Sequence, residues 1–161
     1  MRLLLANTDW AINADNIEKY YNQLDERRHE SVLKQKNADN RIRTLTAGLM
    51  IKRICDENDL KMQLVYNEHG KPEFVNSDIK FNLSHSGKYL ACAYGNEQVG
   101  VDVQEYRFMK DSLIIRFLHE TEQKNVLSDL ENKQKLANAI WTVKEAYIKM
   151  LGTGLSFDMR E

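Results

Sequence analysis

The sequence predicts a mixed α+β fold, because helical and strand patterns occupy separate blocks of the chain rather than alternating. Helical patterns fill most of the first third, short strand patterns fill the middle, and helical patterns return after Asp111. The chain has 161 residues, of which 42% are hydrophobic and 29% are charged. That size and composition predict one globular domain, or two small halves that share a core.

Helices are expected where apolar residues recur near the 3.6-residue period or where a polar segment has helix-starting residues. These segments are residues 15–23, 25–36, 39–57, 112–118, 120–130 and 133–151. Strands are expected where apolar residues alternate with polar ones or form a short apolar run. These segments are residues 2–6, 62–66, 79–83, 89–94 and 99–103, and the first is interpreted as buried. Gly70 and Pro72 predict a turn between the second and third strands.

The charge balance argues against a nucleic-acid partner. The formal net charge is −1, so there is no broad basic excess to replace the counterions of a phosphate backbone. Local cation pairs remain at Arg27–Arg28 and at Arg41 and Arg43. Each pair could hold one small anion or belong to a solvated helix face, and composition alone does not separate these interpretations.

Cysteine content and hydropathy indicate the cellular environment. Cys55 and Cys92 lie in apolar segments, where a free cysteine behaves as a small hydrophobic residue rather than a metal ligand. The apolar run at residues 1–6 is too short for a signal sequence, and no run approaches the roughly 18 residues of a membrane span. We therefore expect a cytoplasmic protein that does not cross a membrane.

The last helical segment carries a distinctive stripe. Trp141, Glu145 and Lys149 are spaced by four residues and so lie along one side of the helix. A glutamate and a lysine one turn apart are usually an ordinary surface pair, worth about 0.2–0.5 kcal/mol. Here they precede Gly152, where the helix is expected to end in a turn that glycine permits. An apolar stripe is expected on another face, formed by Leu136, Ile140, Val143, Tyr147 and Leu151.

Asp102 and Gln104 are candidate metal ligands. On the expected strand 99–103 their side chains point to the same face, and carboxylate and amide oxygens suit Mg²⁺. Gly100 is expected to permit the close approach of a ligand. An aspartate on the solvated face of a strand is common, so the interpretation depends on Glu145 completing a cluster of three oxygen ligands.

Ser84 and His85 do not predict a hydrolase. As neighbours on a strand they face opposite ways, which makes a poor nucleophile–base pair, and the Gly-x-Ser-x-Gly elbow is absent from the sequence around them. Polar side chains at a strand end before Gly87 suit hydrogen bonding to phosphate, or they form an ordinary polar hairpin end.

Four motifs occur in order: Gly70-Lys-Pro72, Phe81-Asn-Leu-Ser-His-Ser-Gly87, Gly100-Val-Asp-Val103, and Trp141-x-x-Lys-Glu-Ala-x-x-Lys149 followed by Gly152-x-Gly-Leu155. In content, order and spacing they resemble the 4'-phosphopantetheinyl transferases of the Sfp-like kind. The tryptophan and the Lys-Glu-Ala triplet place the similarity nearer the W/KEA subgroup. The similarity extends from about Arg41 to Leu155.

The resemblance implies a pseudo-two-fold α+β fold with coenzyme A in a cleft between two halves, residues 1–97 and residues 98–161. It implies transfer of 4'-phosphopantetheine from coenzyme A to a serine of an apo acyl or peptidyl carrier protein. The transfer would release 3',5'-ADP and depend on Mg²⁺. The resemblance does not distinguish a monomer from a homodimer.

The resemblance also implies roles for individual residues. Asp102, Gln104 and Glu145 would ligate Mg²⁺, and Lys149 would hold a phosphate. Glu145 is also the candidate base that takes the proton of the serine, and Glu122 matches a glutamate near the reacting centre. The remaining residues would bind coenzyme A, with Arg43, Thr44, Ser84 and His85 at the 3'-phosphate end and Lys71 and Pro72 at the adenine side.

Two features depart from the family pattern. Gln104 stands where the surfactin-type pattern has a glutamate, which should weaken Mg²⁺ binding or leave a water in that place. The sequence ends at Glu161, whereas Sfp-like relatives continue with strands that complete the sheet of the second half. A non-catalytic relative that binds coenzyme A or a carrier protein is therefore the alternative. A Mg²⁺-dependent nucleotide hydrolase is a third interpretation of the same acidic cluster.

Overall fold

The structure is a computed structural model that describes residues 1–11, 17–153 and 158–160. The first residues of the helix expected at 15–23, and the motif residues Gly154 and Leu155, lie outside this described part. The elements are β1 (Arg2–Asn7), a 3-10 helix (Asp9–Ala11), α1 (Glu18–Tyr21), α2 (Glu26–Leu33), α3 (Ala38–Glu57), β2 (Leu64–Tyr66), β3 (Pro72–Phe74), β4 (Lys80–Ser86), β5 (Tyr89–Gly95), α4 (Asp111–Phe117), α5 (Glu120–Ser128) and α6 (Lys133–Leu151).

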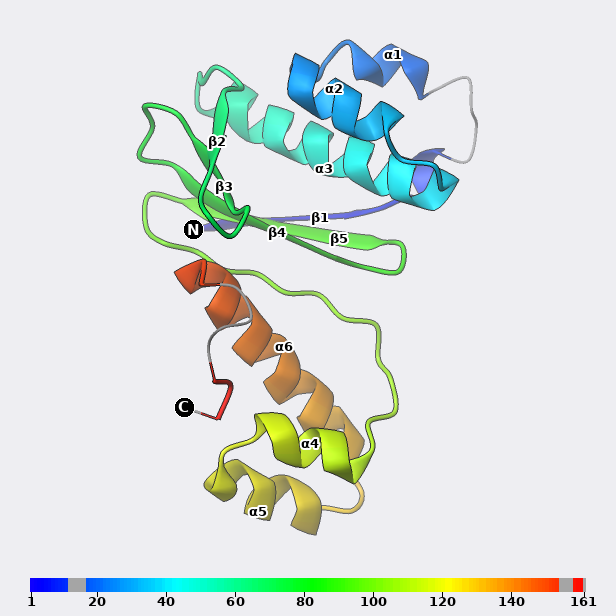
Figure 1. Ribbon diagram of the computed structural model, residues 1–161, viewed down its shortest axis with the longest axis vertical. Coiled ribbons are helices and arrows are strands. Elements are labelled where there is room, and N and C mark those ends of the chain that lie inside the picture. The colour runs from blue at the N-terminus through cyan, green and yellow to red at the C-terminus, as the bar shows by residue number, and fades with distance from the viewer. Residues whose placement is uncertain (12–16, 154–157, 161) are drawn as a thin grey trace.

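A three-stranded antiparallel sheet lies at the middle of the molecule. Its strand order is β1-β5-β4, and β2 and β3 form a separate two-stranded hairpin. Helices α1–α3 lie on one side of the sheet, and α4–α6 lie on the other (Figure 1). The predicted α+β class is confirmed. The pseudo-two-fold relation between two halves stays a prediction.

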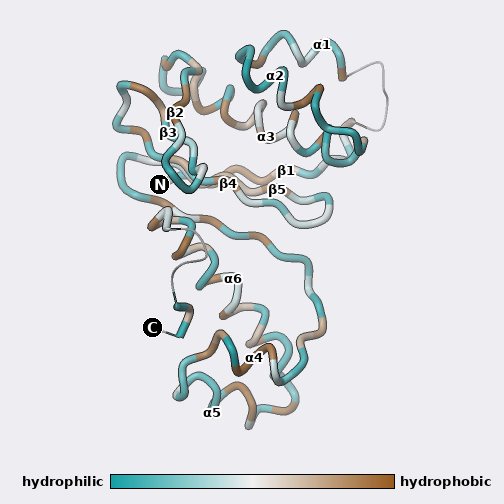
Figure 2. Tube along the Cα trace, in the orientation of Figure 1, coloured by the Kyte–Doolittle hydropathy of each residue, from teal (hydrophilic) through white to brown (hydrophobic). Residues whose placement is uncertain are grey.

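Helix α3 packs on the sheet because its turns place apolar residues on one side. Asn37 caps its first turn, its side chain accepting a hydrogen bond from the Asn40 N–H. Buried residues of α3, β3, β4 and β5 form one hydrophobic cluster: Met50, Ile51, Ile54, Cys55, Phe74, Phe81, Leu90, Cys92 and Tyr94. Figure 2 shows mainly hydrophilic residues along α1, which lies farther from this core than α3 does.

A second hydrophobic cluster joins α4, α5 and α6. It is formed by Met109, Ile114, Phe117, Leu118, Val126 and Ala137. The rings of Phe117 and Trp141 meet edge to face at 5.0 Å, which links α4 to α6. Helix α6 has the predicted bounds and ends at Gly152, whose φ of 71° is the left-handed conformation that glycine adopts readily.

Three expectations about apolar segments are wrong in part. Residues 99–103 are extended but form no strand. Strand β1 is an edge strand, and the exposed fractions of Leu3 and Leu5 are 55% and 72%. In the apolar stripe of α6, Leu136 and Ile140 pack against the cluster formed with α4 and α5. Val143 is 68% exposed.

The two cysteines lie in the apolar core, as expected. Cys55 and Cys92 are buried, and burial raises the pKa of the Cys92 thiol to about 12, so it behaves as an inert apolar group. Among the described residues, no helix combines the length and the hydropathy that a membrane span requires.

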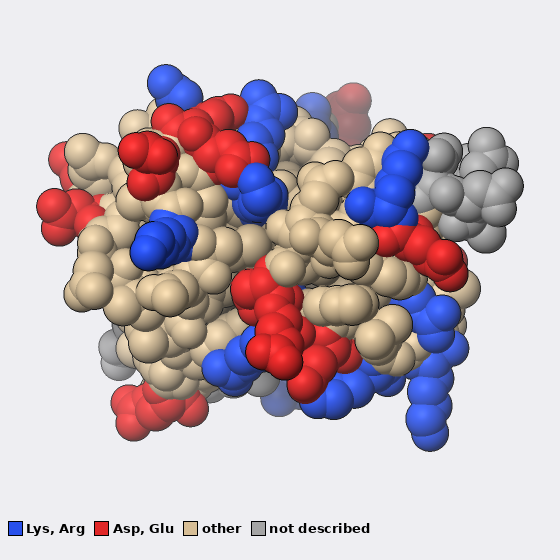
Figure 3. Space-filling view, turned by 90° about the horizontal axis from the view of Figure 1, so that it is seen from above, with Lys and Arg blue, Asp and Glu red and all other residues tan. Residues whose placement is uncertain are grey.

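On the face formed by α1–α3, cationic and anionic side chains are interspersed (Figure 3), partly as pairs one turn apart such as Lys52 and Asp56.

Candidate active site

Residues 101–105 are held on the sheet by side chains instead of a backbone ladder. Alternate residues of β4 accept hydrogen bonds from alternate backbone N–H groups of this segment. These bonds join Asn82 to Val101 (3.0 Å), Ser84 to Val103 (3.2 Å) and Ser86 to Glu105 (2.9 Å). Phe81 lies in the core beneath α3, so the polar residues that alternate with it face the opposite side of the sheet. This arrangement explains why the segment is extended without being a strand.

The carboxylate of Asp102 is fixed between these anchored residues. Its Oδ1 accepts hydrogen bonds from the Ser84 hydroxyl at 2.7 Å and the Lys149 ammonium at 2.5 Å. Its Oδ2 accepts one from the Gln104 amide nitrogen at 2.8 Å. The structure therefore brings together four residues that the sequence analysis had named. The Ser84 hydroxyl donates its hydrogen bond to Asp102, so this donor is already used within the protein.

Gly100 sets the distance between this segment and α6. A methyl group at this position would lie 1.9 Å from the carbonyl oxygen of Ala146, so any larger residue would push the two segments apart. The close approach that Gly100 permits is therefore by the protein's own helix, and not by a ligand as expected. This packing lets α6 present Glu145 and Lys149 near Asp102.

Glu145 lies in an environment that disfavours its charge. Burial raises the pKa of Glu145, and the neighbouring Asp102 carboxylate raises it further, against the opposing effects of Lys149 and Arg107. A cation bound between the Asp102 and Glu145 carboxylates would stabilise their ionised forms. Asp102 and Glu145 thus form the acidic part of the cluster that the sequence predicted.

The donor set at this point fits Mg²⁺. The described residues include no group of three His, Cys, Asp or Glu side chains that could hold a metal alone. Mg²⁺ in nucleotide enzymes is typically held by one or two carboxylates, with substrate phosphates and waters as the other ligands. Asp102 and Glu145 match that requirement. Gln104 presents its amide nitrogen to Asp102, so its oxygen is its remaining candidate ligand atom.

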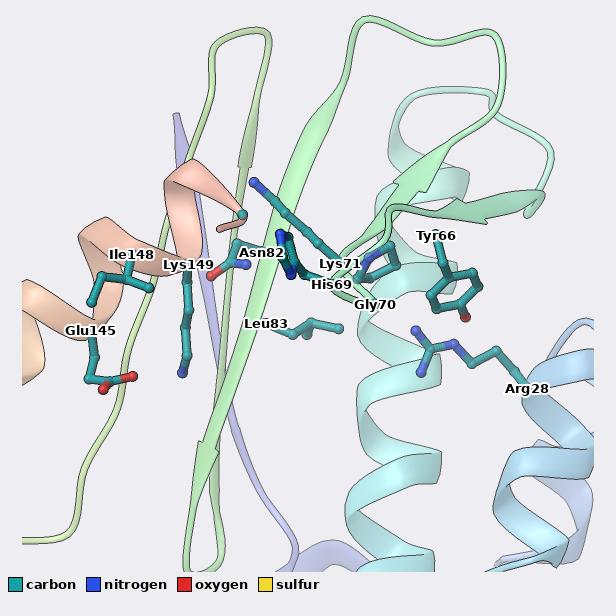
Figure 4. A pocket seen from close by; sticks show the side chains of 12 residues that line it. Arg28, Tyr66, His69, Gly70, Lys71, Asn82, Leu83, Glu145, Ile148 and Lys149 are labelled. Atoms are coloured by element: carbon teal, nitrogen blue, oxygen red, sulfur yellow. The ribbon is translucent and has the colours of Figure 1, made fainter. Parts of the chain in front are cut away.

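A cavity of about 500 Å³ opens beside these residues. It is lined by Arg28, Tyr66, His69, Gly70, Lys71, Pro72, Asn82, Leu83, Glu145, Ile148, Lys149 and Gly152. Figure 4 shows Glu145 and Lys149 entering from α6 on one side, while Arg28 from α2 and Tyr66 from β2 stand on the other. The cavity therefore joins the acidic cluster to Arg28, a cation contributed by the first third of the chain.

Arg28 is a cation of this cavity that was only loosely indicated by the sequence. Its Nε is buried and has no hydrogen-bond partner among the described residues. The adjacent Arg27 stacks its guanidinium 4.0 Å from the ring centre of Tyr66. Tyr66 and His69 were missed by sequence reasoning. Their position beside the Gly70-Lys-Pro72 turn is the signal that could have identified them.

Lys71 and Pro72 line the cavity, and Lys71 also ties the hairpin to the end of α6. The Lys71 ammonium donates to the carbonyl oxygen of Met150 at 2.7 Å, and the Asn67 amide donates to that of Gly152 at 3.3 Å. Burial lowers the pKa of Lys71. A cation at the carbonyl end of a helix also interacts favourably with the helix dipole.

Arg43, Thr44 and His85 do not line the cavity. Arg43 donates to the Gly87 carbonyl oxygen at 2.9 Å, and the Thr44 hydroxyl donates to the Asn40 carbonyl oxygen within its own helix. Partial burial lowers the pKa of His85, and the charges of Arg43 and Lys149 lower it further. Arg43 and His85 are thus near enough to interact electrostatically, as a shared anion site requires.

Glu122 lies with α5 rather than with the acidic cluster. Its carboxylate accepts from the His119 N–H at 2.8 Å and from the Lys144 ammonium at 2.6 Å. The first contact is half of a capping box at the start of α5. Glu122 is not among the residues that line the cavity, and its role near a reacting centre stays a prediction.

Comparison with known proteins shows what the chain is similar to. The family model described as the 4'-phosphopantetheinyl transferase superfamily matches residues 98–161. The 4'-phosphopantetheinyl transferase gsp of Aneurinibacillus migulanus is 33% identical over 136 residues, covering 80% of this chain and 56% of that protein. The 4'-phosphopantetheinyl transferase Sfp of Bacillus subtilis is 24% identical over 159 residues, covering 94% of this chain and 70% of that protein.

Residues 98–161 of the chain match the 4'-phosphopantetheinyl transferase superfamily.

The match to the superfamily begins just before Gly100 and so includes Asp102, Glu145 and Lys149. A further relative, the 4'-phosphopantetheinyl transferase HetI of a Nostoc species, is 40% identical over 100 residues. The chain spans about half the length of several of these transferases, with 56% of gsp and 42% of HetI matched.

Proposed function

We propose that this chain transfers 4'-phosphopantetheine from coenzyme A to a serine of an apo acyl or peptidyl carrier protein, with Mg²⁺ as cofactor. The observation that carries the proposal is the meeting of Asp102, Glu145 and Lys149 beside a cavity of about 500 Å³. The match to the superfamily supports the reaction type, and the names of the relatives support the transferred group.

The proposed reaction is a displacement at the β-phosphorus of coenzyme A. The serine oxygen forms a new bond to that phosphorus, the bond to the bridging pyrophosphate oxygen breaks, and 3',5'-ADP leaves. Such reactions are helped mainly by positioning and by stabilisation of negative charge. Mg²⁺ would be held by Asp102 and Glu145, and would supply charge stabilisation at the pyrophosphate.

Residues of the chain supply the remaining functions. Lys149 offers an ammonium to the phosphates. Glu145 accepts the proton of the attacking serine, and its raised pKa makes it a stronger base than an ordinary carboxylate. Arg28 faces the cavity and is the cation best placed for the nucleotide. Arg43 and His85 are proposed to hold the 3'-phosphate from outside the cavity.

The test of the proposal is an assay with purified chain, coenzyme A, Mg²⁺ and an apo carrier protein. The intact mass of the carrier should increase by one phosphopantetheine, with release of an equal amount of 3',5'-ADP. Binding of coenzyme A without a mass gain would instead support the non-catalytic alternative. Release of 3',5'-ADP without any carrier would support a hydrolase.

A further inference from the structure

The carboxylate of Asp102 accepts three hydrogen bonds from donors of its own chain, two of them on Oδ1. Ser84 and Lys149 donate to Oδ1, and Gln104 donates to Oδ2. The side chain of Asp102 is 0% exposed, so water does not reach these oxygens from outside. A cation that coordinates Oδ1 must therefore displace one of the two donors that this oxygen accepts from.

Lys149 is the donor that a cation would displace most readily. Its ammonium carries a positive charge, so it and a divalent cation repel each other at a shared oxygen. The Ser84 hydroxyl is neutral and is also held by the Val103 N–H at 3.2 Å. The Lys149 side chain is 31% exposed and lines the cavity (Figure 4), so it borders open space on one side.

We propose that Lys149 is a displaceable counter-ion of Asp102, which competes with a divalent cation for Oδ1. The proposal rests on the proposed function for the presence of a divalent cation at Asp102. It gives Lys149 two positions, one on the carboxylate and one on a phosphate group in the cavity. The lysine therefore positions Asp102 as well as contacting the substrate.

This competition has a consequence for binding order. When the Lys149 ammonium binds a phosphate group, Oδ1 of Asp102 becomes available to the cation. When a cation binds Oδ1, the ammonium becomes available to the phosphate group. Each ligand should therefore strengthen the binding of the other, and thermodynamic linkage requires the two effects to be equal. Coenzyme A and the cation are then expected to bind cooperatively.

The first test is a titration with Mn²⁺ alone, followed by electron paramagnetic resonance, without coenzyme A or carrier protein. Lys149→Met removes the ammonium and keeps the stem, so Mn²⁺ should bind about tenfold more tightly than to the original chain, because the buried carboxylate loses its counter-ion. Lys149→Arg keeps the charge and should bind Mn²⁺ nearly as the original chain does. Lys135→Met, at an exposed position of α6, is the matched control and should change nothing.

The second test uses the unmodified chain and so does not depend on the folding of a variant. Acetic anhydride labels accessible lysines, and mass spectrometry of peptides gives the rate at each position. Addition of Mg²⁺ should increase the labelling rate of Lys149 severalfold and leave that of Lys135 unchanged. An unchanged rate at Lys149, or an unchanged or weaker Mn²⁺ affinity in a folded Lys149→Met variant, would overturn the proposal.

These results are separable from the proposed function. Neither measurement contains coenzyme A or a carrier protein. If both succeed and transfer to the carrier is absent, the counter-ion assignment stands and the proposed reaction fails. If transfer occurs and either measurement gives the contrary result, only the counter-ion assignment fails.

Discussion

At the residue scale, the catalytic role proposed for Glu145 is accompanied by a cost in stability. The structure holds its carboxylate partly buried and near Asp102, which raises its pKa and disfavours its ionised form. The same environment that makes it a stronger base destabilises the folded chain when Glu145 is ionised. Candidate catalytic groups commonly show perturbed pKa values for this reason.

The substitution Glu145→Gln should therefore stabilise the chain at neutral pH. The ionised carboxylate is disfavoured in the folded state, and protonation relieves this as pH falls through the raised pKa toward the ordinary value. The gain should be present at pH 7–8, of the order of 1–3 °C in Tm, and should disappear below about pH 4.5. Thermal unfolding of both chains across pH measures it, with Glu120→Gln as an exposed control. A variant less stable than the original at pH 7.5 would contradict the assignment.

At the element scale, side chains of β4 replace a backbone ladder and set the position of the segment that carries Asp102. The bond from Val101 to Asn82 is partly buried and ends on the buried Asn82, while that from Glu105 to Ser86 is exposed. Loss of the first bond should therefore cost more stability than loss of the second, because an unpaired N–H away from solvent cannot form a hydrogen bond to water instead.

Asn82→Ala should destabilise the chain by about 1–3 kcal/mol, since it leaves the Val101 N–H unsatisfied. Ser86→Ala should cost under about 0.5 kcal/mol, because the Glu105 N–H can bond to water. Urea unfolding followed by circular dichroism gives both values. Equal costs for the two variants would show that the segment is held mainly by something other than these bonds.

The elements differ in how far the sequence alone could predict them. Helix α6 was predicted with its observed bounds, because its apolar spacing and Gly152 are local signals. Residues 99–103 were not, because alternation predicts an extended chain but not which groups satisfy its backbone. The three-residue strand β3, which begins at Pro72, is too short to give a pattern.

The candidate site was predicted through motifs more than through local chemistry. Asp102, Glu145 and Lys149 were named together and lie together. The bond from Ser84 to Asp102 depends on the pairing of segments 18 residues apart, which no local pattern specifies. Glu122 was named for its sequence position, and in the structure it caps α5 and pairs with Lys144.

At the scale of the whole molecule, the cavity lies between two parts of the chain, each of which has its own hydrophobic cluster. One cluster supports the sheet and α3, and the other supports α4–α6. The residues that line the cavity come from two stretches of the chain, some between Arg28 and Leu83 and the others between Glu145 and Gly152. Contacts such as Lys71 to Met150 join the two parts beside it.

Binding of coenzyme A with Mg²⁺ should therefore stabilise both parts together. At a ligand concentration 100 times Kd, the free energy of unfolding should rise by about 2.7 kcal/mol. Hydrogen exchange should slow in α3 and in α6, and comparison with coenzyme A alone isolates the contribution of the cation. Slower exchange confined to one of these helices would contradict a ligand that bridges the two parts.

The central claim is that Asp102, Glu145 and Lys149 form the working centre of a phosphopantetheinyl transferase. The most direct measurement compares the initial rate at which an apo carrier protein gains mass with the original chain and with Glu145→Gln, at saturating coenzyme A and Mg²⁺. The original chain should modify the carrier, and Glu145→Gln should be slower by roughly 10²-fold or more while remaining folded, as the loss of a general base predicts. An original chain that adds no phosphopantetheine, or a Glu145→Gln variant with near-normal turnover, would contradict the claim.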